Sequence, residues 1–271
     1  MKIFKYLLLV SILLFTSCEE VVMPDLETTE PRLVIEAVME KEIFDNGFGY
    51  RSYVRLTLTA PYFANQVPVV ENATVSVTDE NGQVYEFLYD ENGYYYPANP
   101  IIIENNLEYT LKIVYENQVY TTVQNLAETV PLLYVEQNND GGFSNDVIEL
   151  KAFFEDPLGE ENYYLYAGLS QKGNLFDAIN DEFFDGNQIF VFFSLDELEA
   201  GDEVLFRLMG IDREAYNYYF SLLLQTEAPA GPFETQPATI RGNIVNQDQP
   251  ENFPFGYFRI SEVSVLSYTV E

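Results

Sequence analysis

One cysteine, Cys18, carries the clearest chemistry in this 271-residue sequence. It follows a charged start, an apolar run from Tyr6 to Phe15 and two small residues. The run is too short to span a bilayer as a helix, which is typical of a cleaved signal peptide. A thiol at the new N-terminus can take a diacylglycerol. We therefore predict that residues 1–17 are a lipoprotein signal peptide and that Cys18 is lipidated and palmitate-bearing; a plain secretory signal would leave it an unpaired thiol.

The stretch after the cysteine is predicted to be a lipidated tether, residues 18–31. It is polar, contains prolines and shows neither helical nor strand periodicity. Fully extended, it reaches roughly 40 Å. Glu19 and Glu20 resemble the acidic export signal of many Bacteroidota lipoproteins, which implies an outer-membrane protein that faces the cell exterior, with the periplasmic face as the alternative. No later apolar run approaches the roughly 20 residues of a membrane span, so we expect membrane attachment through Cys18.

Paired acidic residues are the second group of side chains whose types could do chemistry. A glycosidase needs two carboxylates at a suitable separation and no histidine. The candidate pairs are Glu155-Asp156, Glu160-Glu161, Asp181-Glu182 and Asp196-Glu197. Since the sequence contains 44 acidic residues, such pairs also arise from composition alone. A carboxylate-only hydrolase is therefore the third of the functions that we consider.

The absence of histidine from the sequence excludes several kinds of enzyme. Ser-His-Asp and Cys-His relays and imidazole zinc sites all need that side chain. Ser170 lies in Gly168-Leu169-Ser170-Gln171-Lys172-Gly173, which lacks the second glycine of a nucleophile elbow at its proper offset. We predict no catalytic residue, no metal site and no cofactor, and leave open whether a calcium ion binds.

The charge of the chain is strongly negative. Its 44 acidic and 13 basic residues give a net charge of −31, and loss of Lys2 and Lys5 with the signal peptide makes it more negative still. Nucleic acids and anionic membrane surfaces need clusters of Lys and Arg, and no such run occurs after residue 5. We therefore expect no nucleic-acid partner. An acidic surface keeps an exported protein soluble, and the alternative is binding of cations.

Short runs rich in Val, Ile, Thr, Tyr and Phe alternate with period two and predict β-strands over residues 32–125. Asp-Glu-Asn-Gly occurs at residues 79–82 and again at 90–93, and Asn-Gly favours the positive-φ turns of hairpins. These features predict an immunoglobulin-like or transthyretin-like sandwich. Its strands are expected at Leu33–Met39, Tyr53–Thr59, Ala73–Thr78, Val84–Tyr89, Tyr94–Tyr96, Tyr109–Tyr115 and Val119–Val123.

A second β-rich domain is predicted over residues 131–271. Asp212 is a good N-cap, and Tyr216, Tyr219, Phe220 and Leu223 follow it at helical spacing, which predicts an amphipathic helix at residues 213–225. We expect Tyr219 and Phe220 to face the core; the alternative is a ligand platform. The predicted fold class is all-β, with two β-sandwich-like domains. Strands of the second are expected at Val147–Phe154, Tyr163–Ser170, Ile189–Phe193, Val204–Met209, Tyr257–Ile260 and Val263–Val270.

Several stretches together resemble one family. They are the lipoprotein cysteine, Pro31–Ala37, Ala73–Asp79 followed by Gly82 and Tyr85, Tyr109–Leu111, and Phe255–Phe258. Over nearly the whole mature chain, the sequence is similar to the Bacteroidota lipoprotein family called domain of unknown function 4249, whose genes often lie beside TonB-dependent outer-membrane receptors. Ala37 stands where a glycine is usual, and residues 253–256 replace Asn-Pro-Leu-Gly. The family has no established catalytic residues, so the resemblance implies none here.

The resemblance implies a non-catalytic accessory protein that binds ligand as a partner of a TonB-dependent receptor. The main alternative is a free-standing surface binding protein or adhesin, which would share the anchor and the sandwich domains. Sandwich domains present loops on a rigid body, so we expect the contact surface around Tyr62–Val69 and Asn174–Asn187.

Overall fold

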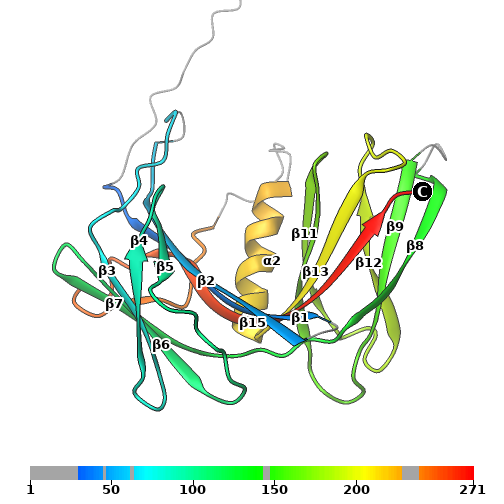
Figure 1. The fold of residues 1–271 in the computed structure, drawn as a ribbon. Helices are drawn as coiled ribbons and strands as arrows, with labels where there is room; N and C mark the ends of the chain where they lie inside the picture. The colour runs from blue at the N-terminus through cyan, green and yellow to red at the C-terminus, as the bar shows by residue number, and fades with distance from the viewer. Residues whose placement is uncertain (1–29, 45–46, 62–63, 143–146, 228–237) are drawn as a thin grey trace, which may run out of the picture. The chain divides into compact units, whose positions relative to one another are not determined.

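The computed structural model describes residues 30–44, 47–61, 64–142, 147–227 and 238–271. Residues Pro31–Glu271 form one compact unit, shown in Figure 1. The predicted signal peptide, Cys18 and nearly all of the tether lie outside the described residues. The described residues therefore make up the body of the protein.

The predicted fold class is confirmed: the body is all-β with one helix in its described part. Most predicted strands are found, and the first two are longer than the sequence indicated. The expected final pair, Tyr257–Ile260 and Val263–Val270, is wrong, because one continuous strand runs over Phe255–Thr269. The elements are β1 (Leu33–Phe44), β2 (Gly47–Leu58), β3 (Thr74–Asp79), β4 (Val84–Tyr89), β5 (Tyr94–Pro97), β6 (Glu108–Tyr115), β7 (Gln118–Asn125), β8 (Leu132–Gly141), β9 (Val147–Glu155), β10 (Tyr163–Ser170), β11 (Asn174–Asn180), β12 (Gln188–Ser194), β13 (Glu203–Ile211), α2 (Arg213–Glu227), β14 (Val245–Asn246) and β15 (Phe255–Thr269).

The last strand, β15, joins the two regions that the sequence separates. It pairs in parallel with β1 and antiparallel with β13, in the middle of a twelve-stranded sheet with the order β11-β10-β13-β15-β1-β2-β5-β4-β3-β6-β7-β14. A three-stranded sheet has the order β12-β9-β8. The predicted domains, 32–125 and 131–271, therefore share one sheet, and the boundary between them stays a prediction.

The period-two pattern of the strands builds two main cores. Alternate residues of β1, such as Ile35 and Met39, point into the first core together with side chains from β2 to β7. Phe258 and Ile260 of β15 complete this core. The second core lies between β8, β9 and β12 on one side and β10 and β13 on the other, so two β-layers pack face to face there.

The repeated Asp-Glu-Asn-Gly turns have the predicted role. They connect β3 to β4 and β4 to β5, and Gly82 and Gly93 both have φ of +83°. In the first turn, the Asp79 carboxylate also accepts a hydrogen bond from the Gln83 backbone N–H at 2.9 Å. These contacts fix the hairpins of a β-meander at the edge of the first core.

Helix α2 begins where the sequence predicts and covers the face of the sheet opposite the second core. Asp212 caps it, because its Oδ1 atom accepts a 2.7 Å hydrogen bond from the Ala215 backbone N–H. Ala215, Tyr219 and Leu223 lie one turn apart and pack against residues of β10, β13 and β15. The helices of the described residues include none long and apolar enough to cross a bilayer.

The prediction that Phe220 faces the core is wrong. Its side chain is 40% exposed and stacks on Tyr216, with the ring centroids 5.5 Å apart. The row through Ala215, Tyr219 and Leu223 makes the sheet contact, and one step along a helix turns the next side chain by about 100°. Phe220 therefore lies beside the contact row.

Replacing Phe220 with alanine is expected to lower the free energy of unfolding by about 1 kcal/mol or less, because little buried surface is lost. Phe206→Ala is the control, since Phe206 is fully buried in the second core and its truncation should cost about 3 to 5 kcal/mol. Urea unfolding of both variants measures the difference. Equal losses in the two variants would show that Phe220 is packed in a core.

Candidate ligand-binding pocket

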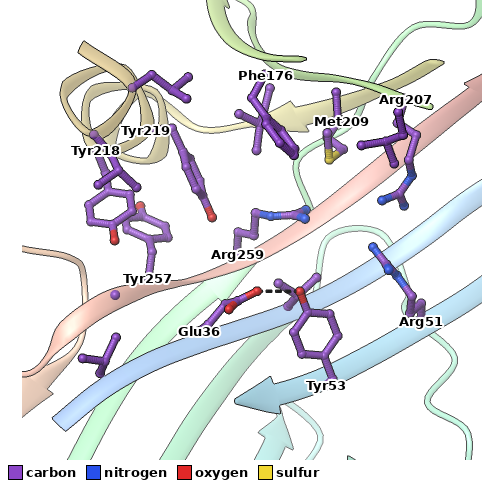
Figure 2. Close-up of a pocket in the computed structure, with 18 residues that line it drawn as sticks. Glu36, Arg51, Tyr53, Phe176, Arg207, Met209, Tyr218, Tyr219, Tyr257 and Arg259 are labelled. Atoms are coloured by element: carbon purple, nitrogen blue, oxygen red, sulfur yellow. Dashed lines mark hydrogen bonds between the residues drawn. The ribbon is translucent and has the colours of Figure 1, made fainter. Parts of the chain in front are cut away.

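A pocket lies between α2 and the outer face of the sheet, across the adjacent strands β10, β13, β15, β1 and β2 (Figure 2). Its volume is about 580 Å³, within the range of small-molecule sites. The wall formed by α2 and β10 is mostly apolar or aromatic, and the floor carries charged side chains from neighbouring strands. The lining residues are Val34, Glu36, Val38, Arg51, Tyr53, Leu165, Ala167, Leu169, Phe176, Arg207, Met209, Tyr218, Tyr219, Leu222, Leu223, Gly256, Tyr257 and Arg259.

Strand alternation places the charged side chains on this face. In β1 the odd-numbered residues from Leu33 to Met39 enter the first core, so Glu36, Glu40 and Glu42 belong to the opposite face. Arg259 in β15 lies between the buried Phe258 and Ile260 of the same strand and likewise faces away from the core. The alternation that directs apolar side chains into the core therefore also directs these charged side chains to the pocket face.

Glu40 is the centre of a buried ion-pair network at the floor of the pocket. Its side chain is 0% exposed, and it accepts hydrogen bonds from three arginines on three neighbouring strands. Arg259 Nη2 donates to Oε1 at 2.5 Å, and Arg207 Nη2 donates to Oε2 at 2.8 Å. Arg51 donates to Oε2 through Nε at 2.8 Å and Nη2 at 2.5 Å. The network joins β2, β1, β15 and β13.

The arginines keep Glu40 ionised. Burial by itself would raise its pKa, but the charges of Arg259, Arg207 and Arg51 together outweigh burial and lower the pKa to about 2. The same carboxylate raises the pKa of Arg259 against the effect of burial. Glu40 and Arg259 are thus both charged at neutral pH.

The guanidinium groups retain hydrogen-bonding capacity toward the pocket. Arg207 also donates to Glu42 Oε1 at 2.6 Å. Among the described residues, the buried Nη1 atom of Arg259 has no hydrogen-bond partner. The Arg51 side chain is 47% exposed, so it presents its charge at the opening of the network. A buried N–H group without an acceptor is costly, which makes this corner suited to an incoming oxygen atom.

Phenol groups and one carboxylate complete the polar lining. Glu36 Oε1 accepts a 2.8 Å hydrogen bond from the Tyr53 hydroxyl (Figure 2), and burial together with the Glu36 charge raises the pKa of Tyr53. Burial also raises the pKa of Tyr218 to about 12 and the pKa of Tyr219. These phenols are therefore neutral at physiological pH and can donate hydrogen bonds.

The acidic pairs predicted as possible catalytic groups do not lie in this pocket. Asp156 and Asp181, from two of the four pairs, instead meet Asp185, and one carboxylate oxygen of each lies within 4.8 Å of the others. Asp156 accepts hydrogen bonds from the Tyr164 hydroxyl at 2.8 Å and the Gly186 N–H at 3.3 Å, and burial raises its pKa. These bonds hold the turn after β11 against the turn after β9.

The remaining acidic pairs are not brought together. Glu161 instead forms an ion pair with Arg213 at the start of α2. Glu160 and the pair Asp196-Glu197 do not join the Asp156 cluster. Ser170 closes a tight turn, where its hydroxyl donates to the Gly173 carbonyl at 3.0 Å. Glu161 and Ser170 thus have structural roles, and Glu160, Asp196 and Glu197 do not belong to the carboxylate cluster.

The network residues Glu40, Arg51, Arg207 and Arg259 were not identified from the sequence. A signal for two of them exists, because Arg207 and Arg259 each stand between apolar residues in the middle of a predicted strand. Arginine is rarely fully buried without a partner, so its presence in such a run indicates an ion pair. Nothing in the sequence indicates which carboxylate supplies it.

The predicted contact loops are only partly loops. Tyr62 lies outside the described residues, and Asn174–Asn180 forms the strand β11, so that part of the loop prediction is wrong. The pairing of β11 with β10 explains the difference, since it continues the sheet by one strand. Residues 181–187 do form a turn.

A separate exposed surface lies on the outer face of the three-stranded sheet. Tyr134 stacks on Phe153 with centroids 4.8 Å apart, and Phe153 contacts Phe190 at 5.4 Å. Lys151 lies 4.7 Å from the centre of the Phe190 ring. We call Tyr134, Phe153 and Phe190 the aromatic strip. Such exposed apolar surface is typical of interaction sites.

The comparisons with known proteins give a family and little else. The family model "Domain of unknown function (DUF4249)" matches residues 19–267. No curated protein gives a significant match. A solved segment of two fibronectin type III domains from chicken tenascin is 11% identical, covering 59% of this chain and 84% of that chain. Its TM-score of 0.20 is too low to support a conclusion about the fold.

Proposed function

Since this chain belongs to the DUF4249 family, whose description gives no function, we propose that it is a lipid-anchored, ligand-binding protein of the outer membrane in a Bacteroidota bacterium. In this proposal it is a non-catalytic accessory partner of a TonB-dependent receptor. It presents ligand outside the cell, and the receptor imports the ligand. The anchor is Cys18, and the tether holds the body away from the lipid headgroups.

The observation that carries the binding role is the pocket beneath α2. It has the volume of a small-molecule site, an apolar wall and a floor of fixed, charged hydrogen-bond donors. A few placed polar groups in an otherwise apolar cavity are what ligand binding requires. The network that fixes the arginines also ties four strands together, so the donors are held in position before a ligand arrives.

The aromatic strip supports a docking role. Tyr134 and Phe190 are each about two-fifths exposed on a rigid sheet, and aromatic residues are enriched at protein interfaces. The strip belongs to the β12-β9-β8 sheet, whereas the pocket is built on the twelve-stranded sheet. A partner could therefore bind the strip while the pocket stays accessible.

Lipidation at Cys18 is expected to be detectable by metabolic labelling with an alkyne-bearing palmitate analogue. The wild-type chain should carry the label, and Cys18→Ala should lose it, because this is the only cysteine in the sequence. Equal labelling of Cys18→Ala would contradict the anchor. Loss of label with retention of the uncleaved chain would agree with lipidation before cleavage.

The partner is tested by photo-crosslinking in intact cells, with a photoreactive residue placed at Phe190 of the aromatic strip. We expect a covalent product with a TonB-dependent receptor. The matched control places the same group at Leu88, an exposed apolar residue of β4 far along the twelve-stranded sheet. Crosslinks from neither position, with normal growth of a deletion strain, would favour the free-standing binding protein or adhesin.

A further inference from the structure

The geometry points to a small amphipathic organic anion as the ligand of the pocket beneath α2. Its carboxylate or phosphate group binds at Arg51, Arg207 and Arg259, and its apolar or aromatic body lies along α2. The inference deepens the ligand-binding part of the proposed function and rests on it, but it does not depend on which receptor is the partner.

Three guanidinium groups converge at one place in an otherwise acidic chain. The sequence has 13 Lys and Arg residues against 44 acidic ones, yet Arg51, Arg207 and Arg259 all contact one carboxylate. Figure 2 shows their side chains directed toward the same part of the pocket. Arginine is the side chain best suited to bind carboxylate and phosphate groups through paired hydrogen bonds. A negatively charged group is therefore the favoured occupant.

The unused donor specifies where the anion binds. Arg259 is buried and donates one hydrogen bond to Glu40, while its Nη1 atom is buried without a partner among the described residues. Each guanidinium has five N–H donors, more than the network of Glu40 and Glu42 accepts. Since Nη1 is covered, the ligand must displace a neighbouring side chain slightly. Arg51, being half exposed, makes the first contact.

The apolar wall specifies the rest of the ligand. Leu222 of α2 is 39% exposed and Phe176 of β11 is 45% exposed, and both line the pocket. Met209 and Leu223 extend the apolar surface inward. An inorganic ion would leave this surface in water, whereas an apolar or aromatic body would cover it and be favoured by the removal of apolar surface from water.

The charge of Glu36 allows the sign of the ligand's charge to be tested. It lines the pocket and accepts its hydrogen bond from Tyr53, so its negative charge faces the same space as the arginines. A carboxylate ligand is repelled by Glu36 and attracted by Arg51. Glu36→Gln keeps an acceptor for Tyr53 while it removes the charge. A plain anion must therefore bind more tightly to Glu36→Gln and more weakly to Arg51→Gln.

The probes are 4-phenylbutanoate, 4-phenylbutyl phosphate and the uncharged 4-phenylbutanamide, titrated by calorimetry into the full lipoprotein held in phosphatidylcholine nanodiscs. Empty nanodiscs correct for partitioning into lipid. We expect at least one of the two anions to bind with a dissociation constant of about 1 mM or tighter, and the amide to bind at least tenfold more weakly. The stronger of the two anions identifies the headgroup. Inorganic phosphate should bind more weakly than either.

Matched variants separate the pocket from general charge effects. Arg51→Gln should weaken anion binding at least tenfold, whereas Arg213→Gln, which removes the same charge at an exposed position outside the pocket, should leave it unchanged. Glu36→Gln should tighten binding about threefold. Leu222→Ala should weaken binding, and Leu224→Ala, on the same helix outside the lining, should not. Unchanged circular dichroism and melting temperatures verify folding.

Three results overturn the proposal: no binding of either organic anion, equal binding of anion and amide, or equal effects of Arg51→Gln and Arg213→Gln. None of these results changes whether Phe190 crosslinks to a receptor, so failure of the ligand assignment and failure of the accessory role are distinguishable.

Discussion

Replacing Glu40 with glutamine is expected to lower the free energy of unfolding by roughly 3 to 5 kcal/mol. The side chain is completely buried, and its loss of charge leaves Arg259 and Arg207 buried without their main counter-ion. The amide of glutamine fits the same space but places an N–H donor against guanidinium donors. The variant should also lose affinity for the anionic probes, because the arginines are no longer held in place.

The control for this prediction is Glu86→Gln, which makes the same chemical change on the exposed face of β4. That variant should unfold within about 0.5 kcal/mol of the wild type. Urea denaturation followed by circular dichroism measures both. A Glu40→Gln variant as stable as Glu86→Gln would contradict a structural role for the buried network.

The free energy of unfolding at acid pH also depends on Glu40. The Glu40 pKa is about 2 in the folded chain and 4.5 by its ordinary value. Because the folded pKa is the lower one, the contribution is fully present above pH 4.5 and is lost as the pH falls toward 2. The shift corresponds to roughly 3 kcal/mol. Glu40→Gln should flatten the decline in stability between those values.

Replacing Gly256 with alanine is expected to cost roughly 4 kcal/mol or more, or to prevent folding. Gly256 has φ of +97°, and a Cβ atom there would lie 2.0 Å from the Ile35 carbonyl oxygen. Ile35 and Gly256 are paired in the β1–β15 ladder, so relief of the clash would separate the strands that join the two cores. Gly256 also lines the pocket, and anion binding should be lost with the pairing.

Gly82→Ala is the control that measures the cost of a positive φ without a clash like that between residue 256 and Ile35. Gly82 has a similar φ of +83°, but no atom lies within 4 Å of a Cβ placed there. Its substitution should cost only about 1 kcal/mol, the penalty for a positive φ. Thermal unfolding compares the two variants, and similar losses for both would show that contact with Ile35 does not matter.

The local elements were predictable from the sequence because their signals are local. Period-two alternation indicated the strands, Asn-Gly indicated the meander turns, and Asp212 indicated the start of α2. The place of β15 was not predictable in this way. Its parallel pairing with β1 joins residues more than 200 positions apart, and no local pattern specifies a partner strand.

The candidate site was missed for the same reason. Glu40 gathers side chains from β2, β13 and β15, so the network exists only once those strands are adjacent. In the sequence, Glu40 comes directly after the expected strand Leu33–Met39, where a carboxylate is expected to be exposed to solvent. In the structure, α2 packs on this face of the sheet and partly covers it. The error at Phe220 is the opposite one: an apolar residue that was expected to be buried is exposed beside the contact row.

The most direct measurement of the ligand assignment is a crystal structure of the protein soaked with 4-(4-bromophenyl)butanoate, in which anomalous scattering locates the bromine. We expect a bromine peak between Leu222 and Phe176 and a carboxylate within hydrogen-bonding distance of Arg51, together with loss of both in Arg51→Gln crystals. A bromine peak elsewhere on the molecule, or an unoccupied pocket in crystals that hold the compound at saturating concentration, would contradict the assignment.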